Sequence, residues 1–159
     1  MSSGLILVWY TFEIPTQNIM KLNPYLNFTG NAKEAFEFYQ SVFGGELTFH
    51  KMLDVPDGEN LSSEEQEMMM HVSLPIGDGQ FLMASDCLKS RGETVTFGNN
   101  NYISLSPDNR DEATRLFNGL STDGTIEMPL DDMFWGEYFG SFKDKFGVSW
   151  MINFSNNNA

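Results

Sequence analysis

One pattern, a short strand that runs into a capped helix, occurs twice in this chain. The first copy is NPYLNFTGNAKEAFEFYQSVFGG (23–45) and the second is YISLSPDNRDEATRLFNGL (102–120). In each copy an asparagine, Asn31 or Asn109, can cap the first helical turn, and a glutamate three residues later can reach back to it. The apolar helix residues keep the same phase: Ala35, Phe38, Tyr39 and Val42, then Ala113, Leu116, Phe117 and Leu120. A duplicated unit accounts for these coincidences together, whereas two unrelated strand–helix pairs remain the alternative.

Each copy is followed by three further apolar or alternating segments that are typical of strands. These are 46–53, 68–76 and 80–86 in the first half, and 125–130, 136–142 and 148–154 in the second. We therefore predict an α+β fold of two βαβββ modules, about 20–87 and 100–156, within one domain 20–156. Eight strands would form a curved mixed sheet with both helices on its convex face and a trough on its concave face.

The amino-terminal 19 residues differ from this pattern. Their one apolar run, 5–10, is too short to span a bilayer. Because no Lys or Arg precedes Lys21, the basic region of a secretory signal is missing. We expect the compact domain to begin at Met20, with residues 1–19 as an extension outside the core.

The charge balance narrows the choice of partners. The chain has nine Lys and Arg against 22 Asp and Glu, for a net charge of -13. Such a field repels phosphate, so we expect neither nucleic-acid binding nor attachment to an anionic membrane. The single cysteine, Cys87, excludes an internal disulfide and favours the reducing cytoplasm. We interpret its thiol as a bystander and not as a nucleophile.

The trough should be lined by the strand residues opposite in phase to Leu26 and Ile103. We predict a ligand site formed by Asn23, Tyr25, Asn27, Tyr102, Trp135 and Trp150. The aromatic side chains would supply apolar walls, and the amides would orient the ligand.

Two titratable residues are candidates for catalysis. His71 alternates with Val72 and would face the trough as a general base or hydrogen-bond donor. The alternative is a histidine whose hydrogen bonds are satisfied by neighbouring strands. Glu137 shares a strand face with Trp135 and Phe139, which would place a carboxylate among aromatic rings. The alternative is a carboxylate exposed at the rim.

Three segments resemble a known family. They are GNAKEAFEFY (30–39), HVSLPIGDGQFLMASD (71–86) and MFWGEYFGSFKDKFGVSWMI (133–152). They are similar to the PhnB-like subfamily of the vicinal oxygen chelate superfamily, which includes glyoxalases, bleomycin-resistance proteins and extradiol dioxygenases. The resemblance extends from Lys21 to about Phe154 and implies paired βαβββ modules, a small-molecule site and a homodimer.

The resemblance also implies four inward strand positions that would hold a divalent ion. They fall on Asn23, Met83 (or Ser85), Tyr102 and Met151. Thioether sulfur is a poor ligand for hard cations, so we expect no metal at these positions and no cofactor.

The leading hypothesis is a protein that binds an unknown small molecule in this fold without the usual metal centre. One alternative is a metal-dependent lyase, isomerase or dioxygenase with unusual ligands such as His71 and Glu137. A second is a dimeric interaction module with no ligand. The branch also carries a demethylubiquinone methyltransferase-like label. A nucleotide-type methyl-donor site would need a glycine-rich strand-to-helix loop in a parallel sheet, and the sequence has none.

Overall fold

The computed structural model describes residues 20–155. The predicted extension, 1–19, lies outside these residues. The principal elements, in chain order, are β1 (Tyr25–Phe28), α1 (Ala32–Phe43), β2 (Thr48–Lys51), α2 (Ser63–Gln66), β3 (Met69–Gly77), β4 (Gln80–Asp86), β5 (Ile103–Leu105), α3 (Arg110–Leu120), β6 (Thr125–Asp132), β7 (Glu137–Lys143) and β8 (Ser149–Ser155). The predicted βαβββ order is confirmed in both halves, and the short α2 lies in the connection between β2 and β3.

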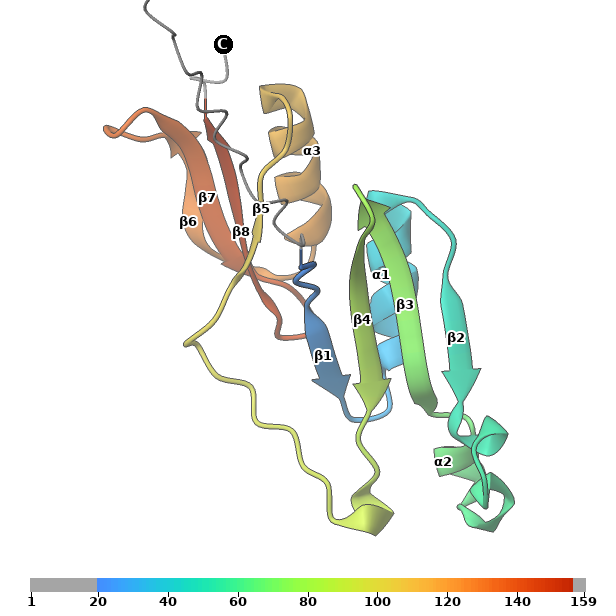
Figure 1. Ribbon diagram of the computed structural model, residues 1–159. Coiled ribbons are helices and arrows are strands. Elements are labelled where there is room, and N and C mark those ends of the chain that lie inside the picture. Colours follow the sequence, from blue (N-terminus) through green and yellow to red (C-terminus); the bar gives the residue numbers. More distant parts are fainter. Residues whose placement is uncertain (1–19, 156–159) are drawn as a thin grey trace, which may run out of the picture.

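The eight strands form two four-stranded sheets with the same internal order. The first is β1-β4-β3-β2 and the second is β5-β8-β7-β6. In each sheet the first pair is parallel and the other two pairs are antiparallel. Figure 1 shows β1 at the edge of its sheet that lies nearest to the second sheet. The predicted mixed α+β fold is therefore confirmed, and in the part of the chain described here its hydrogen bonding divides the strands into two sets of four.

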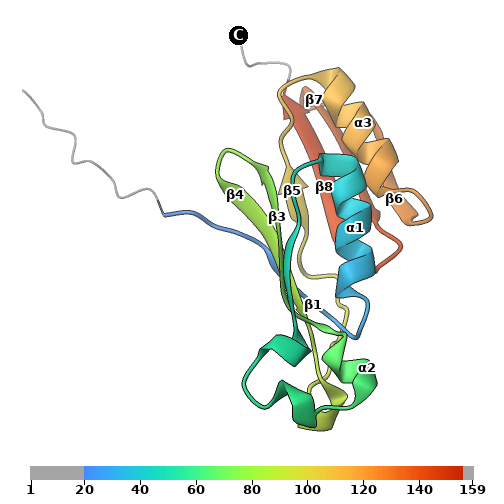
Figure 2. The same cartoon turned by 90° about the vertical axis from the view of Figure 1, so that its right-hand side faces the viewer.

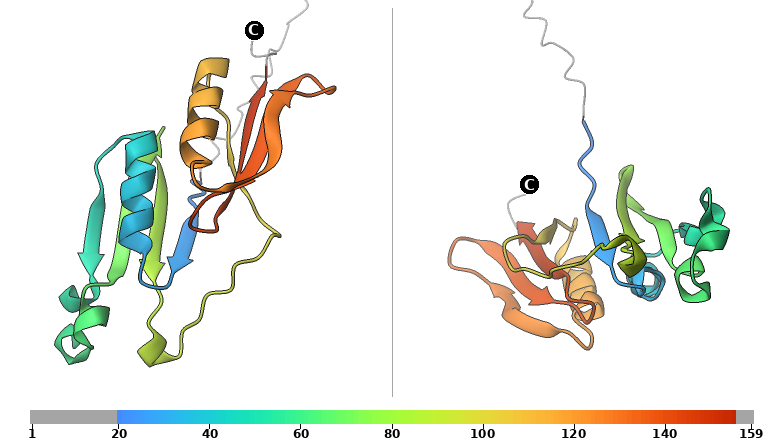
Figure 3. Two further views of the ribbon diagram at one scale, coloured as in Figure 1. Left: turned by 180° about the vertical axis from the view of Figure 1, so that it is seen from behind. Right: turned by 90° about the horizontal axis from the view of Figure 1, so that it is seen from below.

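Both helices lie on the same side of the molecule, as Figures 2 and 3 show. Helix α1 packs against β3 and β4, α3 packs against β8, and the two helices contact each other. The shared core contains large side chains from both modules: Phe28, Phe36, Tyr39, Leu74, Leu82, Phe117, Phe142 and Trp150. Neither helix, nor any other in residues 20–155, is long and apolar enough to cross a membrane.

The two helices begin in different ways, although their sequences predict the same cap. Asn109 caps α3 as predicted, because its Oδ1 accepts a hydrogen bond from the Glu112 amide at 2.8 Å. Asn31 makes no side-chain cap on α1. Asp86, at the end of β4, accepts instead from the amides of Gly30 and Ala32, at 2.8 and 3.1 Å. The predicted cap of α1 is therefore wrong, because a buried carboxylate from the neighbouring strand reaches these amides.

The start of β3 also departs from simple alternation. Alternation predicts Met70 on the core side with Val72, but the structure buries Met69 and exposes Met70. The register between β2 and β3 shifts here, from His50 opposite His71 to Lys51 opposite Met69. Met70 is the extra residue of a β-bulge, which turns its neighbour into the core.

Candidate ligand site between the modules

The face of the first sheet that points away from α1 carries the predicted polar and aromatic residues of β1. Tyr25 and Asn27 are exposed, whereas Phe28 is buried among the core residues. Tyr25 pairs with Met83 across β1 and β4, and Asn27 pairs with Ser85. We call this surface the open face of the sheet.

His71 and Tyr25 contact each other on this open face. The Tyr25 hydroxyl lies 3.3 Å from His71 Nδ1, and the two rings stack with centroids 5.9 Å apart. His71 is only half-buried. Its ring is therefore held in place by a neighbouring aromatic side chain while one of its nitrogens remains available for another partner.

A cavity lies where β1 approaches the second module. Its volume is about 170 Å³. Its lining residues come from three places: Tyr25, Leu26 and Asn27 of β1; Val95, Thr96, Phe97, Gly98 and Asn101 of the segment between β4 and β5; and Gly147, Val148 and Ser149 at the β7–β8 turn and the first residue of β8. Two of the predicted ligand residues, Tyr25 and Asn27, therefore line this cavity.

The second module repeats the arrangement of the open face. Met151 pairs with Ser104 of β5 and Ser141 of β7, as Met83 pairs with Tyr25 and Ser73 in the first module. The two methionines thus occupy equivalent central positions, which agrees with the internal repeat.

The other two positions implied for metal ligands already have hydrogen-bond partners. Asn23 Oδ1 accepts from the Phe81 amide at 2.8 Å. The Tyr102 hydroxyl donates to Glu127 at 2.7 Å, and this hydrogen bond raises the pKa of Tyr102.

These four positions do not suit a divalent ion. Two are thioethers, one is an amide oxygen that holds a backbone N–H, and one is a protonated phenol that donates to a carboxylate. Within residues 20–155, no three or more His, Cys, Asp or Glu side chains gather as a metal site would need.

The two catalytic candidates lie in different sheets. His71 is on β3 of the first sheet and Glu137 is on β7 of the second. Glu137 accepts a hydrogen bond from the indole of Trp135 at 3.1 Å, and Trp135 is 48% exposed. The structure does not bring His71 and Glu137 together as a pair.

Trp150 belongs to the core and not to the trough. It is completely buried against Tyr39, and its indole N–H donates to Asp144 at 2.8 Å. Because Met151 faces the open side, its neighbour in the strand must face the helices. The prediction that Trp150 lines a ligand site therefore needs correction.

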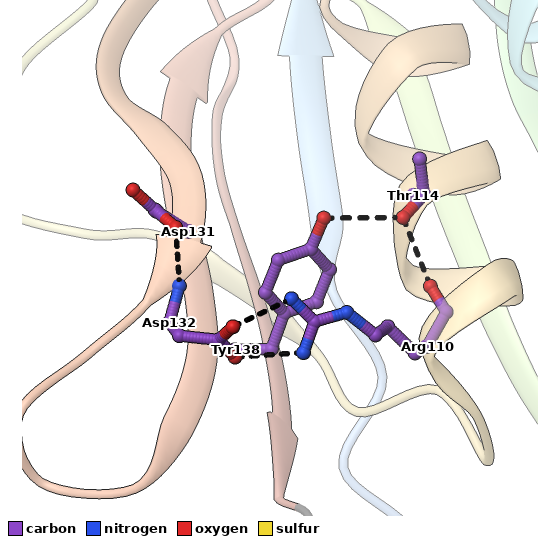
Figure 4. Close-up of polar contacts among 5 residues, drawn as sticks. All are labelled: Arg110, Thr114, Asp131, Asp132 and Tyr138. Atoms are coloured by element: carbon purple, nitrogen blue, oxygen red, sulfur yellow. Dashed lines mark hydrogen bonds and ion pairs between the residues drawn. The ribbon is translucent and has the colours of Figure 1, made fainter.

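The last two residues of β6 are the carboxylates Asp131 and Asp132, and Asp132 forms an ion pair with helix α3. Asp132 accepts two hydrogen bonds from the Arg110 guanidinium, at 2.7 and 2.8 Å, as Figure 4 shows. The guanidinium also lies 3.7 Å from the centre of the Tyr138 ring. Asp131 accepts from the Asp132 amide, and the Tyr138 hydroxyl lies 3.2 Å from Thr114 Oγ1. The group ties the first turn of α3 to the β6–β7 hairpin.

Several lining residues were absent from the sequence prediction. Phe97 and Asn101 belong to an aperiodic segment, so no pattern marked them. A second cavity of about 460 Å³ lies between the β3–β4 turn and the start of α3, and its walls include Gln80, Ser106 and Arg115. Asn153 of β8, which lines neither cavity, was not predicted as a site residue either. It lies opposite Phe139, and its buried Oδ1 has no hydrogen-bond partner within the described residues.

Comparison with known proteins identifies the family. Residues 21–152 match the Glyoxalase/Bleomycin resistance protein/Dioxygenase superfamily. The chain belongs to this superfamily. Its PhnB-like character is supported by a structure from Bacillus cereus described as "Putative 3-demethylubiquinone-9 3-methyltransferase, PhnB protein", at 26% identity and a TM-score of 0.67 over 86% of this chain and 100% of that one.

This superfamily member also aligns with two further relatives over nearly the whole length of each of them. Protein YjdN of Escherichia coli is 34% identical over 143 residues, which are 84% of this chain and 95% of that protein. The crystal structure of protein PA1353 from Pseudomonas aeruginosa has a TM-score of 0.72 at 38% identity, and covers 86% of this chain and 98% of that one. These likenesses confirm the fold and the family without assigning an activity.

Proposed function

We propose that this protein binds a small organic molecule in the cavity where β1 approaches the second module, without a metal at the usual superfamily positions. The observation that carries the proposal is the 170 Å³ cavity lined by Tyr25 and Asn27 on the open face of β1. Ligand cavities for drug-sized molecules are larger, about 300–1,000 Å³. The cavity therefore suits a compound of few heavy atoms, or one end of a longer compound that extends along the open face.

The lining favours a ligand with an apolar ring or chain and at least one polar group. Tyr25 and Phe97 offer aromatic surface and are about half exposed, at 48% and 50%. Asn27, Asn101 and Ser149 offer amide and hydroxyl groups for orientation. An uncompensated anion is disfavoured because the chain carries a net charge of -13.

A thermal-shift screen of small molecules in EDTA tests this proposal. Compounds that raise the unfolding midpoint should bind at least about tenfold more weakly to Asn27→Ala. Gln80→Ala is the matched control, because Gln80 carries the same kind of side chain but lines the larger cavity. Binding that depends on Gln80 and not on Asn27 would place the ligand elsewhere. If compounds raised the unfolding midpoint without EDTA and none did so in EDTA, the metal-dependent alternative would replace this proposal.

We further propose that the protein is a homodimer in the cytoplasm. Support for the dimer comes from apolar side chains on and beside the edge strand β6: Ile126, Met128, Phe134 and Trp135 are 52%, 41%, 98% and 48% exposed. Apolar side chains exposed along an unpaired sheet edge favour association with another chain. Light scattering coupled to gel filtration measures the mass, and Phe134→Ser should shift a dimer toward monomer. A dimer that responds to no small molecule would favour the alternative of an interaction module.

A further inference from the structure

The two histidines of this chain face each other across neighbouring strands. His50 of β2 and His71 of β3 are register partners in an antiparallel pair. Directly opposite residues in such a pair project to the same face, with Cβ atoms about 4.5–5.5 Å apart. Val72, the next residue, is buried on the helix side. Both imidazoles therefore lie on the open face of the first sheet.

The β-bulge next to this pair makes the arrangement possible. Met69 and His71 are two residues apart, so in a regular strand they would share a face. Met69 is nonetheless buried while His71 is on the open face, because the register shifts between His50 and Lys51. Bulges of this kind re-aim side chains and often lie beside functional sites.

Tyr25 prepares one of the two imidazoles to act as a ligand. Its hydroxyl is 3.3 Å from His71 Nδ1, and its ring stacks on the imidazole. When Nδ1 carries the proton and donates it to the Tyr25 oxygen, Nε2 keeps its lone pair. Metal-binding histidines commonly use one nitrogen for the ion and donate a hydrogen bond from the other.

We propose that His50 and His71 together bind one transition-metal cation of the Zn²⁺ or Ni²⁺ type, with water completing its coordination. Imidazole nitrogen is a preferred ligand for these ions, at about 2.0–2.1 Å for Zn²⁺. The net charge of -13 draws cations toward the protein. This site uses β2 and β3, and none of the four superfamily positions. The ion would fasten the edge strand β2 to the sheet.

Titration calorimetry with ZnCl₂, on the full chain after EDTA treatment and desalting, tests the proposal. The wild type should bind one ion per chain, and His50→Ala or His71→Ala should each abolish that binding. The double variant should bind Zn²⁺ no more weakly than either single variant, because the two side chains act as one site. Two independent histidines would bind two ions, with one retained in each single variant. That result, or no binding by the wild type, would overturn the proposal.

Two more variants separate a built site from surface histidines. Thr48→Ala changes the same strand and face, and should leave the affinity unchanged. Tyr25→Phe keeps the stacked ring but removes the hydroxyl, and should weaken Zn²⁺ about tenfold. An unchanged affinity for Tyr25→Phe would remove Tyr25 from the proposal, and a tenfold loss for Thr48→Ala would contradict the site.

Amide hydrogen exchange provides a readout that does not depend on affinity. Zn²⁺ should slow exchange in β2, Thr48–Lys51, in the wild type and not in His50→Ala. The metal-free unfolding midpoint of each variant shows whether it folds. Small-molecule binding and its dependence on Asn27 are measured in EDTA, where no metal is bound. The absence of a metal site would therefore leave the small-molecule proposal standing, and the absence of small-molecule binding would leave the metal site standing.

Discussion

The Tyr39 hydroxyl donates a hydrogen bond to Asp144 at 2.7 Å, and so joins the helix of the first module to the β7–β8 turn of the second. The same carboxylate accepts from the amides of Phe146 and Val148, both at 2.9 Å, and from the indole of Trp150. Asp144 is buried, and four donors surround it. Burial, followed by the charge of Asp144, raises the pKa of Tyr39 far above its usual range, so the phenol stays protonated.

Tyr39→Phe should lower the free energy of unfolding by about 2 kcal/mol, because it removes one hydrogen bond to a buried charge. Asp144→Ala should cost more, roughly 3 kcal/mol or above, because it leaves several buried donors without a partner. Urea denaturation measures both. Equal losses for the two variants would contradict the central role of the carboxylate.

The helix caps provide a second test. Asn109→Ala should cost about 1 kcal/mol, because it removes the hydrogen bond to the Glu112 amide. Asn31→Ala should cost much less, because Asn31 makes no such cap. Asp86→Ala should exceed both, since Asp86 holds the Gly30, Ala32 and Met69 amides. An Asn31 effect equal to that of Asn109 would show that the sequence pattern predicts capping better than the structure.

The Arg110–Asp132 ion pair predicts an acid-sensitive contribution to stability. The hydrogen bonds from Arg110 hold the pKa of the Asp132 carboxyl below its usual range. The folded state therefore favours the charged carboxylate, so its contribution is complete above the unfolded pKa and is lost as the pH falls through the folded pKa.

Asp132→Asn should consequently reduce stability at neutral pH, and the difference from wild type should vanish in acid. Urea denaturation over a pH series measures this difference, which added salt should also reduce because the pair is exposed. Asp131→Asn is the control, since Asp131 hydrogen-bonds to a backbone amide. A difference that grows as the pH falls would refute the assignment.

Gly140 tests the close approach of β7 to its neighbours. A Cβ at this position would lie 2.7 Å from Phe117 Cε2 and 2.9 Å from the Leu130 Cα. Gly140→Ala should therefore destabilise the protein by about 2 kcal/mol. Gly98→Ala is the control, since the nearest atom to its Cβ is the Asn100 Oδ1 at 3.2 Å. Calorimetric unfolding midpoints compare the two, and a tolerated Gly140→Ala would contradict the packing described here.

Much of the fold could be predicted because its signals are local. The helical phase of Ala113 and Leu116, the cap at Asn109 and the alternation at Tyr25 and Asn27 each depend on residues within a few positions of one another. The repeat added the order of elements in both modules. The same alternation should also have placed Trp150 on the helix side, because it precedes Met151 on the same strand.

The sequence by itself determined the two modules, the alternating faces of β1, and the unusual side chains at the positions where the family resemblance implies metal ligands. Tertiary structure decided that Asp86 caps α1, that Asp144 joins the modules, that His50 faces His71, and that an aperiodic segment closes a cavity over Tyr25. The physical reason is the range of the interactions. Periodicity and capping arise from neighbouring residues, whereas strand register, buried carboxylates and cavities depend on which distant segments the packed core brings together.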